Sequence, residues 1–351
     1  MWNYILIAYA FLFPVIWFRG TILRFIAKTW YIYAFLFISL TALLGFLLIF
    51  STAAYDVWQI LEETRLREGS YVVSLQHGQM EYQIVGDKGI WVVISHGSPG
   101  GYDQGLEFCK YVDTSKNRCL AISRPGYLRS SLSLGKTPEQ QADAIAELLN
   151  QLKIDQAVIM GTSGGGPAAL QFSLKYPQKC VGLIMISAIS KKYPEKEATP
   201  CEEIEDFLLE NNFSLNIISL VSQQFPEILA EQFILDQKQR ELFLKDEEKM
   251  RFFLDSFKSL TIFKLRKAGF DNDMQEFKSL PDFLLCNILS PTLILHGAAD
   301  AEVPESHAQN VAANIANGTL KMYPNGEHTL FITHKEEITS EVQKFLNQLD
   351  Y

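Results

Sequence analysis

The sequence has few cysteines and no excess of positive charge, and each deficit excludes a class of function. Five cysteines occur among 351 residues, none of them spaced as C-x-x-C, so neither a zinc site nor a thioredoxin-like centre is indicated. Lys and Arg number 31 against 40 Asp and Glu, which gives a net charge of −9 at pH 7. Nucleic-acid binding needs a basic surface instead. We therefore expect mostly buried thiols, no metal, no cofactor and no nucleic-acid partner.

Charge is also missing from most of the N-terminal region. The run 29–55 contains no charged residue and exceeds the roughly 20 residues that a helix needs to cross a bilayer. A second uncharged run, 2–18, is at the short limit and contains Pro14, so it either spans the membrane or lies on its surface. No basic segment precedes it, which disfavours a cleaved signal peptide. We predict residues 1–55 to be a membrane anchor of one or two transmembrane helices.

Basic residues near the two apolar runs predict the orientation of this anchor. Arg19, Arg24 and Lys28 lie between the runs, whereas Arg65 and Arg67 follow the second one. Positively charged flanks tend to stay in the cytoplasm. We therefore expect a membrane protein whose remaining chain lies outside the cytoplasm.

Beyond a charged juncture at 56–70, apolar strand-like runs alternate with helix-like runs. The strand-like runs are 71–76, 80–86, 90–97, 118–123, 156–160, 181–187, 290–297 and 319–324. Most of them are apolar throughout, which is typical of a mostly parallel sheet that helices cover on both faces.

The alternation stops between residues 191 and 288, where the sequence indicates several helices and no convincing strand pair. Ligands of open α/β sheets bind at the carboxyl edge of the strands, and we expect this insertion to cap that edge. The predicted fold is α/β, with a mostly parallel central sheet covered by helices. Its core comprises residues 71–190 and 289–351, its helical cap residues 191–288, and an N-terminal transmembrane helix or hairpin precedes it.

The stretch "MGTSGGGPAA" at 160–169 lies between a strand-like and a helix-like run. Its glycines do not have the spacing of a dinucleotide-binding loop, and "LGKT" at 134–137 lacks the first glycine of a Walker loop. The stretch does match G-x-S-x-G, in which small residues let strand and helix approach and leave the serine exposed. This pattern predicts Ser163 as a nucleophile, with the Gly164 amide facing the charge that develops on a tetrahedral intermediate.

A serine nucleophile needs a base and a carboxylate that orients the base. Five of the six histidines suit other environments. We expect His77 in a solvated turn, His334 at the start of a solvated surface helix and His307 in a polar helix. His296 suits the core, and His96 suits a residue that shapes the loop after its strand. His328 follows the last predicted strand directly, and Asp300 follows the preceding one. Because parallel strands end at one edge, we expect Ser163, Asp300 and His328 to converge there. The chain order Ser, Asp, His is the one expected for this arrangement.

Five motifs together resemble the α/β-hydrolase fold family in its capped branch: "HGSPGG", "RPGYLRSS", "GTSGGG", "HGAADAEVP" and "GEHTLF". The likeness covers roughly residues 70–190 and 290–350. It implies that Ser163 is the nucleophile, Asp300 the triad acid and His328 the base. It further implies that the backbone amides of Ser98 and Gly164 form the oxyanion hole. The turn and the loop around this hole contain Gly161, Gly165, His96 and Gly97.

The resemblance also narrows the reaction. Dehalogenases and epoxide hydrolases of this fold attack with an aspartate, and position 163 is a serine. "HGSPGG" is one residue from the motif of proline iminopeptidases, which however have a tryptophan where this chain has Gly164. The implied function is a membrane-anchored, esterase-like or lipase-like serine hydrolase that cleaves a carboxylic ester of a lipid or another apolar acyl compound. The alternatives are an iminopeptidase-like peptidase, an acyltransferase, or a hydrolase-fold receptor without catalysis.

Two charged segments of the insertion have two interpretations each. The acidic segment 201–207 either binds a substrate amine or is an exposed helix face. The basic segment 261–270 either contacts anionic lipid head groups or is a solvated amphipathic helix. The solvated interpretation is the simpler one in both cases.

Overall fold

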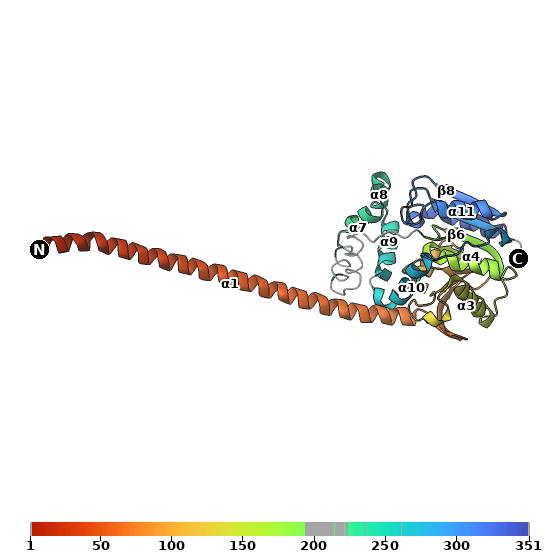
Figure 1. The fold of residues 1–351 in the computed structure, drawn as a ribbon, viewed down its shortest axis with the longest axis horizontal. Coiled ribbons are helices and arrows are strands. Elements are labelled where there is room, and N and C mark those ends of the chain that lie inside the picture. Colours follow the sequence, from red (N-terminus) through yellow and green to blue (C-terminus); the bar gives the residue numbers. More distant parts are fainter. Residues whose placement is uncertain are drawn as a thin grey trace. The chain divides into compact units, whose positions relative to one another are not determined.

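The computed structural model describes residues 2–193, 214, 221, 224–234, 236–260 and 262–349 (Figure 1). It divides into two compact units, one up to Val57 and one from Trp58 onward. Each unit is described by itself. The acidic segment 201–207 lies outside the described residues.

The N-terminal unit is part of helix α1 (Trp2–Glu68). By length and composition, one stretch of the described residues, Lys28–Glu68, is long and apolar enough to cross a membrane. No turn interrupts α1, so the structure shows a single helix and not the alternative hairpin. The reason is local, because the segment between the two apolar runs contains one glycine and no proline to end a helix.

The second unit is built on an eight-stranded sheet with the order β1-β2-β4-β3-β5-β6-β7-β8. Its strands are β1 (Tyr71–Leu75), β2 (Gly78–Val85), β3 (Trp91–Ser95), β4 (Arg118–Ile122), β5 (Ala157–Thr162), β6 (Cys180–Ile186), β7 (Thr292–Gly297) and β8 (Gly318–Tyr323). β1 pairs antiparallel with β2, and β2 antiparallel with β4, whereas all other pairs are parallel. The prediction of a mostly parallel sheet is therefore confirmed.

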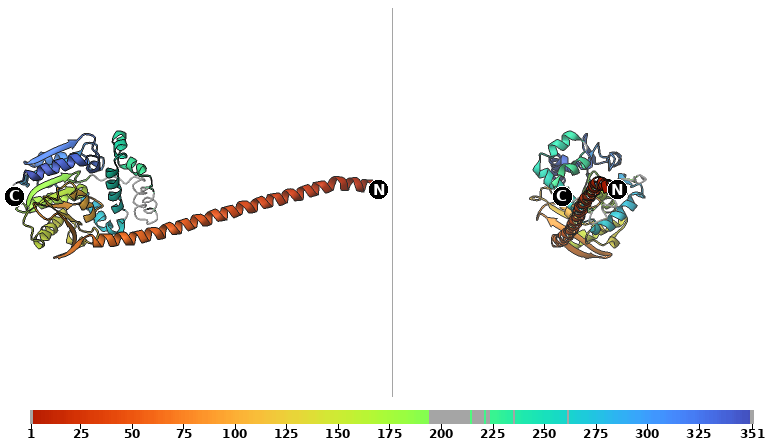
Figure 2. Two further views of the ribbon diagram at one scale, coloured as in Figure 1. Left: turned by 180° about the vertical axis from the view of Figure 1, so that it is seen from behind. Right: turned by 90° about the vertical axis from the view of Figure 1, so that its left-hand side faces the viewer.

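Helices cover both faces of this sheet (Figures 1 and 2). They are α2 (Tyr102–Cys109), α3 (Pro138–Gln151), α4 (Gly166–Lys175), α11 (Ser306–Asn314), α12 (Leu330–Thr333) and α13 (Lys335–Asn347). Successive strand residues alternate between two apolar clusters: Val93 and Ile159 pack with α3, α4 and α11, and Val92 and Val158 pack with α2 and α13. This period of two explains why the parallel strands are apolar throughout.

In its described part, the segment between β6 and β7 consists of helices joined by irregular stretches. It contains α7 (Pro226–Phe233), α8 (Gln237–Phe243), α9 (Glu247–Leu260), the short turn η3 (Phe263–Leu265), α10 (Lys267–Phe277) and the turn η4 (Leu285–Asn287). Helices α7, α8 and α9 lie together beside one end of the sheet (Figures 1 and 2).

Candidate active site

The turn after β5 holds Ser163 in an uncommon backbone conformation. β5 leads directly into the short turn η2 (Ser163–Gly165) and then into α4, and Ser163 has φ = 46°. Few residues other than glycine adopt this left-handed region. A Cβ atom on Gly165 would lie 2.1 Å from the Ser95 carbonyl oxygen, and one on Gly161 would lie 2.8 Å from the Ala169 Cβ. Both glycines are therefore needed for strand and helix to approach while the serine stays raised.

The three side chains predicted to form a triad meet at the carboxyl ends of the strands. His328 Nε2 lies 3.1 Å from Ser163 Oγ, and His328 Nδ1 lies 2.9 and 3.1 Å from the two oxygens of Asp300. Asp300 Oδ1 also accepts the amides of Glu302 at 3.0 Å and Val303 at 2.8 Å. These amides fix the carboxylate, which in turn orients the imidazole so that Nε2 faces the serine.

The surroundings of His328 favour its protonated form. Burial lowers the pKa of this imidazole, but the hydrogen bond to Asp300 and the negative charges of Glu302 and Asp300 outweigh it, so the net pKa lies above the usual 6.5. An imidazole of this kind is suited to take the proton of a serine hydroxyl and to be stabilised once it holds it.

The loop between β3 and α2 passes directly against the nucleophile. A Cβ atom on Gly97 would lie 3.1 Å from Ser163 Cβ, and one on Gly164 would lie 2.2 Å from Ser98 Oγ. Any side chain at position 164 would displace Ser98, which accounts for a glycine there. Among the described residues the Ser98 amide donates to no protein acceptor. The two residues predicted to bind an oxyanion are therefore neighbours, beside Ser163.

His96 shapes this loop and is not available as a base. Its Nδ1 hydrogen-bonds the Gly97 carbonyl at 2.7 Å, and its Nε2 accepts the Arg124 amide at 2.9 Å. Burial, together with the charge of Arg124, lowers the pKa of His96 well below 6.5. The ring is thus neutral and serves as a rigid spacer.

A buried ion pair connects helix α10 to the same loop. Arg124 donates to the Asp273 carboxylate at 2.9 and 2.5 Å, and Tyr127 donates to it at 2.5 Å. The Ser98 hydroxyl donates to Asp273 and accepts from Arg124 at 3.0 Å. The hydroxyl is therefore turned toward α10, and the Ser98 backbone is left to face the nucleophile.

A second buried ion pair corrects the expectation for the basic segment 261–270. Arg266 is fully buried, pairs with Asp103 at 2.8 Å and donates to the Gly100 carbonyl at 2.6 Å. The segment is not a solvated helix, because its apolar residues Ile262 and Phe263 are buried and Arg266 is buried beside them. Both ends of the loop that carries Ser98 are thus held by the same part of the insertion.

Two of the remaining histidines, His307 and His334, are more buried than predicted. His307 is buried and its Nδ1 accepts the Ser190 amide at 3.1 Å, and burial lowers its pKa to about 4. His334 is half-buried and hydrogen-bonds the Thr333 hydroxyl at 2.9 Å. His77 is exposed and His296 is buried, as expected. Within the described residues no group of three acidic, His or Cys side chains could hold a metal.

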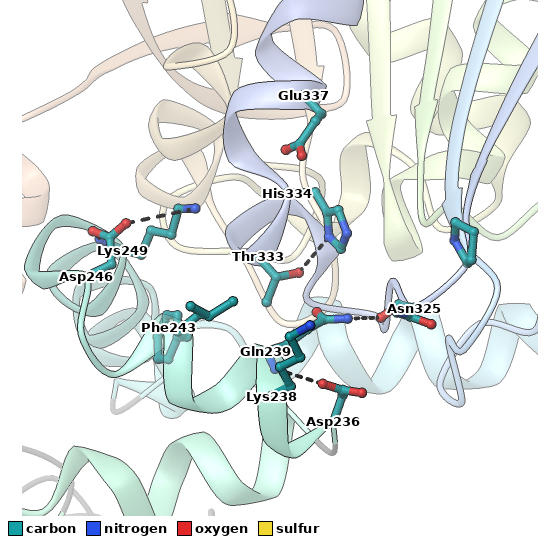
Figure 3. Close-up of a pocket in the computed structure, with 12 residues that line it drawn as sticks. Asp236, Lys238, Gln239, Phe243, Asp246, Lys249, Asn325, Thr333, His334 and Glu337 are labelled. Atoms are coloured by element: carbon teal, nitrogen blue, oxygen red, sulfur yellow. Dashed lines mark hydrogen bonds and ion pairs between the residues drawn. The ribbon is translucent and has the colours of Figure 1, made fainter.

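A cavity of about 600 Å³ lies between α8, the start of α9 and the segment 324–337 (Figure 3). No triad residue lines it. Beside this cavity, α8 and the residue before it contact the loop that carries His328. Gln239 donates to the Asn325 carbonyl at 2.7 Å, and the Asp236 amide donates to Glu327 at 3.0 Å. The insertion therefore holds this loop as well.

The family model for the α/β-hydrolase fold matches residues 90–335. The chain belongs to this family. The hydrolase YcgS of Bacillus subtilis is 23% identical over 276 residues, which are 77% of this chain and 95% of that protein. A 2-hydroxy-6-oxononadienedioate/2-hydroxy-6-oxononatrienedioate hydrolase of Pseudomonas putida is 24% identical over 291 residues, 80% and 97% of the two chains.

A solved α/β-hydrolase fold protein from Nakamurella multipartita is 29% identical, with a TM-score of 0.72 over 79% of this chain and 98% of that one. Fold and relatives together make this chain a hydrolase of the α/β fold. The family match begins at residue 90, so helix α1 lies outside it.

Sequence reasoning missed four residues of this site: Glu302, Arg124, Asp273 and Arg266. Glu302 Oε2 lies 3.5 Å from His328 Nε2, and the other three form the buried pairs described above. The partners of these residues are far away in the sequence, so no local sequence pattern predicts the contacts. The only available signal was an arginine directly after a predicted strand, at position 124.

Proposed function

We propose that this protein is a membrane-anchored serine hydrolase of the capped branch that cleaves a carboxylic ester through an acyl-enzyme. The observation that supports it most is the continuous line of hydrogen-bonding distances from Ser163 Oγ through His328 to Asp300. A binding protein has no need for all three groups in this arrangement, whereas acyl transfer requires each of them.

The first half of the reaction forms the acyl-enzyme. Ser163 Oγ attacks the ester carbonyl carbon while its proton passes to His328 Nε2, and the carbonyl oxygen becomes an oxyanion. The amides of Ser98 and Gly164 stabilise this charge. The oxyanion then collapses, the bond to the leaving alcohol breaks, and His328 returns the proton to the alcohol oxygen.

The second half releases the acid. A water molecule gives its proton to His328 Nε2 and attacks the acyl carbon, which again forms an oxyanion. The bond to Ser163 Oγ breaks and the serine regains the proton from His328. Asp300 stays ionised and keeps the imidazole in the tautomer with its free lone pair on Nε2.

The apolar N-terminal helix supports the membrane part of the proposal. Residues 1–55 anchor the protein, 56–70 connect it to the hydrolase core of 71–190 and 289–351, and 191–288 form the cap. The basic residues between the two apolar runs favour an orientation with the core outside the cytoplasm. A catalytic domain held next to a bilayer suits an apolar or lipid acyl substrate.

Hydrolysis of p-nitrophenyl esters by the full chain in detergent tests this function. We expect turnover that depends on acyl length and that falls about a thousandfold or more in Ser163→Ala. Ser115→Ala is the matched control, because Ser115 is exposed and far from the triad in the sequence. Turnover that survives in Ser163→Ala, or no turnover of any chain length by the unmodified protein, would contradict the proposal.

A further inference from the structure

One carboxylate at this site has no function in the reaction just described. Glu302 lies in the loop after β7, and its Oε2 is 3.5 Å from His328 Nε2. The same nitrogen is 3.1 Å from Ser163 Oγ. Glu302 therefore places a second negative charge, after that of Asp300, beside the imidazole and on the side that faces the nucleophile.

The backbone of Glu302 is held from both sides. Its amide donates to Asp300 Oδ1 at 3.0 Å, and its carbonyl accepts the Tyr193 hydroxyl. The side chain thus starts from a fixed point next to the triad, although 59% of it is exposed. The position of Glu302 follows from the way Asp300 is held, because the Glu302 amide is one of the two donors to the Asp300 carboxylate.

Within the part of the chain that the structure describes, no lysine or arginine pairs with Glu302. Among the described residues His328 is the only basic side chain within 4.0 Å of this carboxylate, and His328 must be neutral before it can accept the serine proton. In the resting site the imidazole then lies between two carboxylates, of which Asp300 is buried and Glu302 is largely exposed. A cationic group of the substrate would complement this charge.

The chemistry indicates which part of the substrate carries the cation. The leaving group receives its proton from His328 Nε2 and must come within about 3 Å of that nitrogen. Glu302 is next to the same nitrogen, so it faces the leaving group. We infer that Glu302 selects esters whose leaving group carries a cationic amino group close to the scissile bond. This inference rests on the proposed function.

Two isosteric esters test the inference. Choline butyrate and 3,3-dimethylbutyl butyrate differ only in a positive nitrogen that replaces a carbon, and the charge of a quaternary ammonium does not change with pH. We expect the full chain in detergent, at low ionic strength, to prefer the choline ester about fivefold in kcat/KM. This factor corresponds to about 1 kcal/mol, the value of a partly exposed ion pair. Added salt should reduce the preference.

Glu302→Gln should abolish the preference, since it keeps the shape of the side chain and removes its charge. Glu305→Gln is the matched control: Glu305 is an exposed glutamate of the same loop, and its variant should keep the ratio of the two rates. If Glu302 only tunes His328, Glu302→Gln would change both rates equally and leave the ratio intact, which would overturn the inference. Equal rates in the unmodified protein would overturn it as well.

Labelling with a fluorophosphonate separates this result from the proposed function. If the unmodified protein is labelled at Ser163 but shows no cation preference, only the role of Glu302 is wrong. If it is not labelled at Ser163, the serine hydrolase proposal itself fails.

Discussion

Asp300 has the most complete set of contacts in the triad. Its carboxylate accepts two backbone amides and lies within hydrogen-bonding distance of His328 Nδ1. Its Oδ2 is also 3.6 Å from His296 Nε2, which in turn contacts the Val303 carbonyl at 2.8 Å. This network fixes both the position of the acid and the tautomer of the base.

Asp300→Asn should lower kcat on p-nitrophenyl esters by about a thousand- to ten-thousandfold. The amide keeps the size of the carboxylate but no longer favours the His328 tautomer that leaves Nε2 free for the serine proton. KM should change little, because Asp300 is buried and does not contact substrate. The exposed residue Asp155 provides the control Asp155→Asn, and a comparable loss in both variants would contradict this role.

The pH dependence of kcat/KM should show His328 titrating above its usual 6.5. The charged groups that face it are Asp300 and Glu302, with the neighbouring imidazole of His296 behind Asp300. The two carboxylates raise the pKa of His328 against the effect of burial. Since the base works only when neutral, activity should fall as pH drops through this raised value. A pH–rate profile with its acidic midpoint at or below 6.5 would contradict the geometry.

At the scale of residues, the sequence identified the side chains that local patterns mark. Ser163 was marked by G-x-S-x-G, and Asp300 and His328 by their positions directly after strands. The structure brings these three together, while their catalytic roles stay a prediction. Glu302 and Asp273 were not identified, because their importance comes from contacts across the fold and no spacing encodes such contacts.

At the scale of elements, α10 links the insertion to the loop beside the nucleophile. Asp273 on this helix is buried against Arg124 and Tyr127 and contacts Ser98. Gly269 of the same helix packs on Tyr127: a Cβ atom there would lie 2.3 Å from the ring. Helix α10 of the insertion therefore helps to hold the loop that carries Ser98 in place.

Asp273→Ala should reduce the free energy of unfolding by about 3–5 kcal/mol, because it leaves the Arg124 guanidinium buried without its carboxylate. Asp271→Ala on the same helix should cost about 0.5 kcal/mol or less, since Asp271 is exposed and its one ion pair among the described residues is with Lys267. Urea denaturation of the full chain in detergent measures both values. Equal losses in the two variants would show that the buried pair does not hold α10 in place.

The elements themselves were predictable where the pattern was strong. Apolar runs that alternate with amphipathic runs predicted the parallel strands β3 to β8 and the helices between them. The basic segment 261–270 was misjudged, because charge spacing alone does not reveal that Arg266 pairs with the partly buried Asp103 in α2, more than 160 residues earlier. Long-range pairing decides the environment of such a residue.

At the scale of the whole molecule, the sequence predicted an apolar N-terminal region outside the catalytic fold. It left open one helix or two, because Pro14 and the short run 2–18 fit either arrangement. The structure describes a single helix, α1. The side of the membrane on which the hydrolase core lies depends on the few basic residues that flank the apolar runs, and it is open to a direct test.

An impermeant maleimide should label Cys286 in intact cells that produce the full chain. Cys286 is exposed, whereas Cys109, Cys119 and Cys180 are buried. A Cys201→Ser background removes the fifth thiol, and Cys286→Ser is the control that should lose the label. Labelling that appears only after the cells are lysed would place the core in the cytoplasm. Labelled protein in the supernatant of unlysed cells would contradict a membrane anchor.

The central claim is that Ser163 is a nucleophile activated by His328 and Asp300. Its most direct test is mass spectrometry of the intact chain and its peptides after treatment with a fluorophosphonate. We predict one adduct, on the peptide that contains Ser163, and none in Ser163→Ala or after denaturation before treatment. No adduct on the folded protein, or an adduct that persists in Ser163→Ala, would contradict the account.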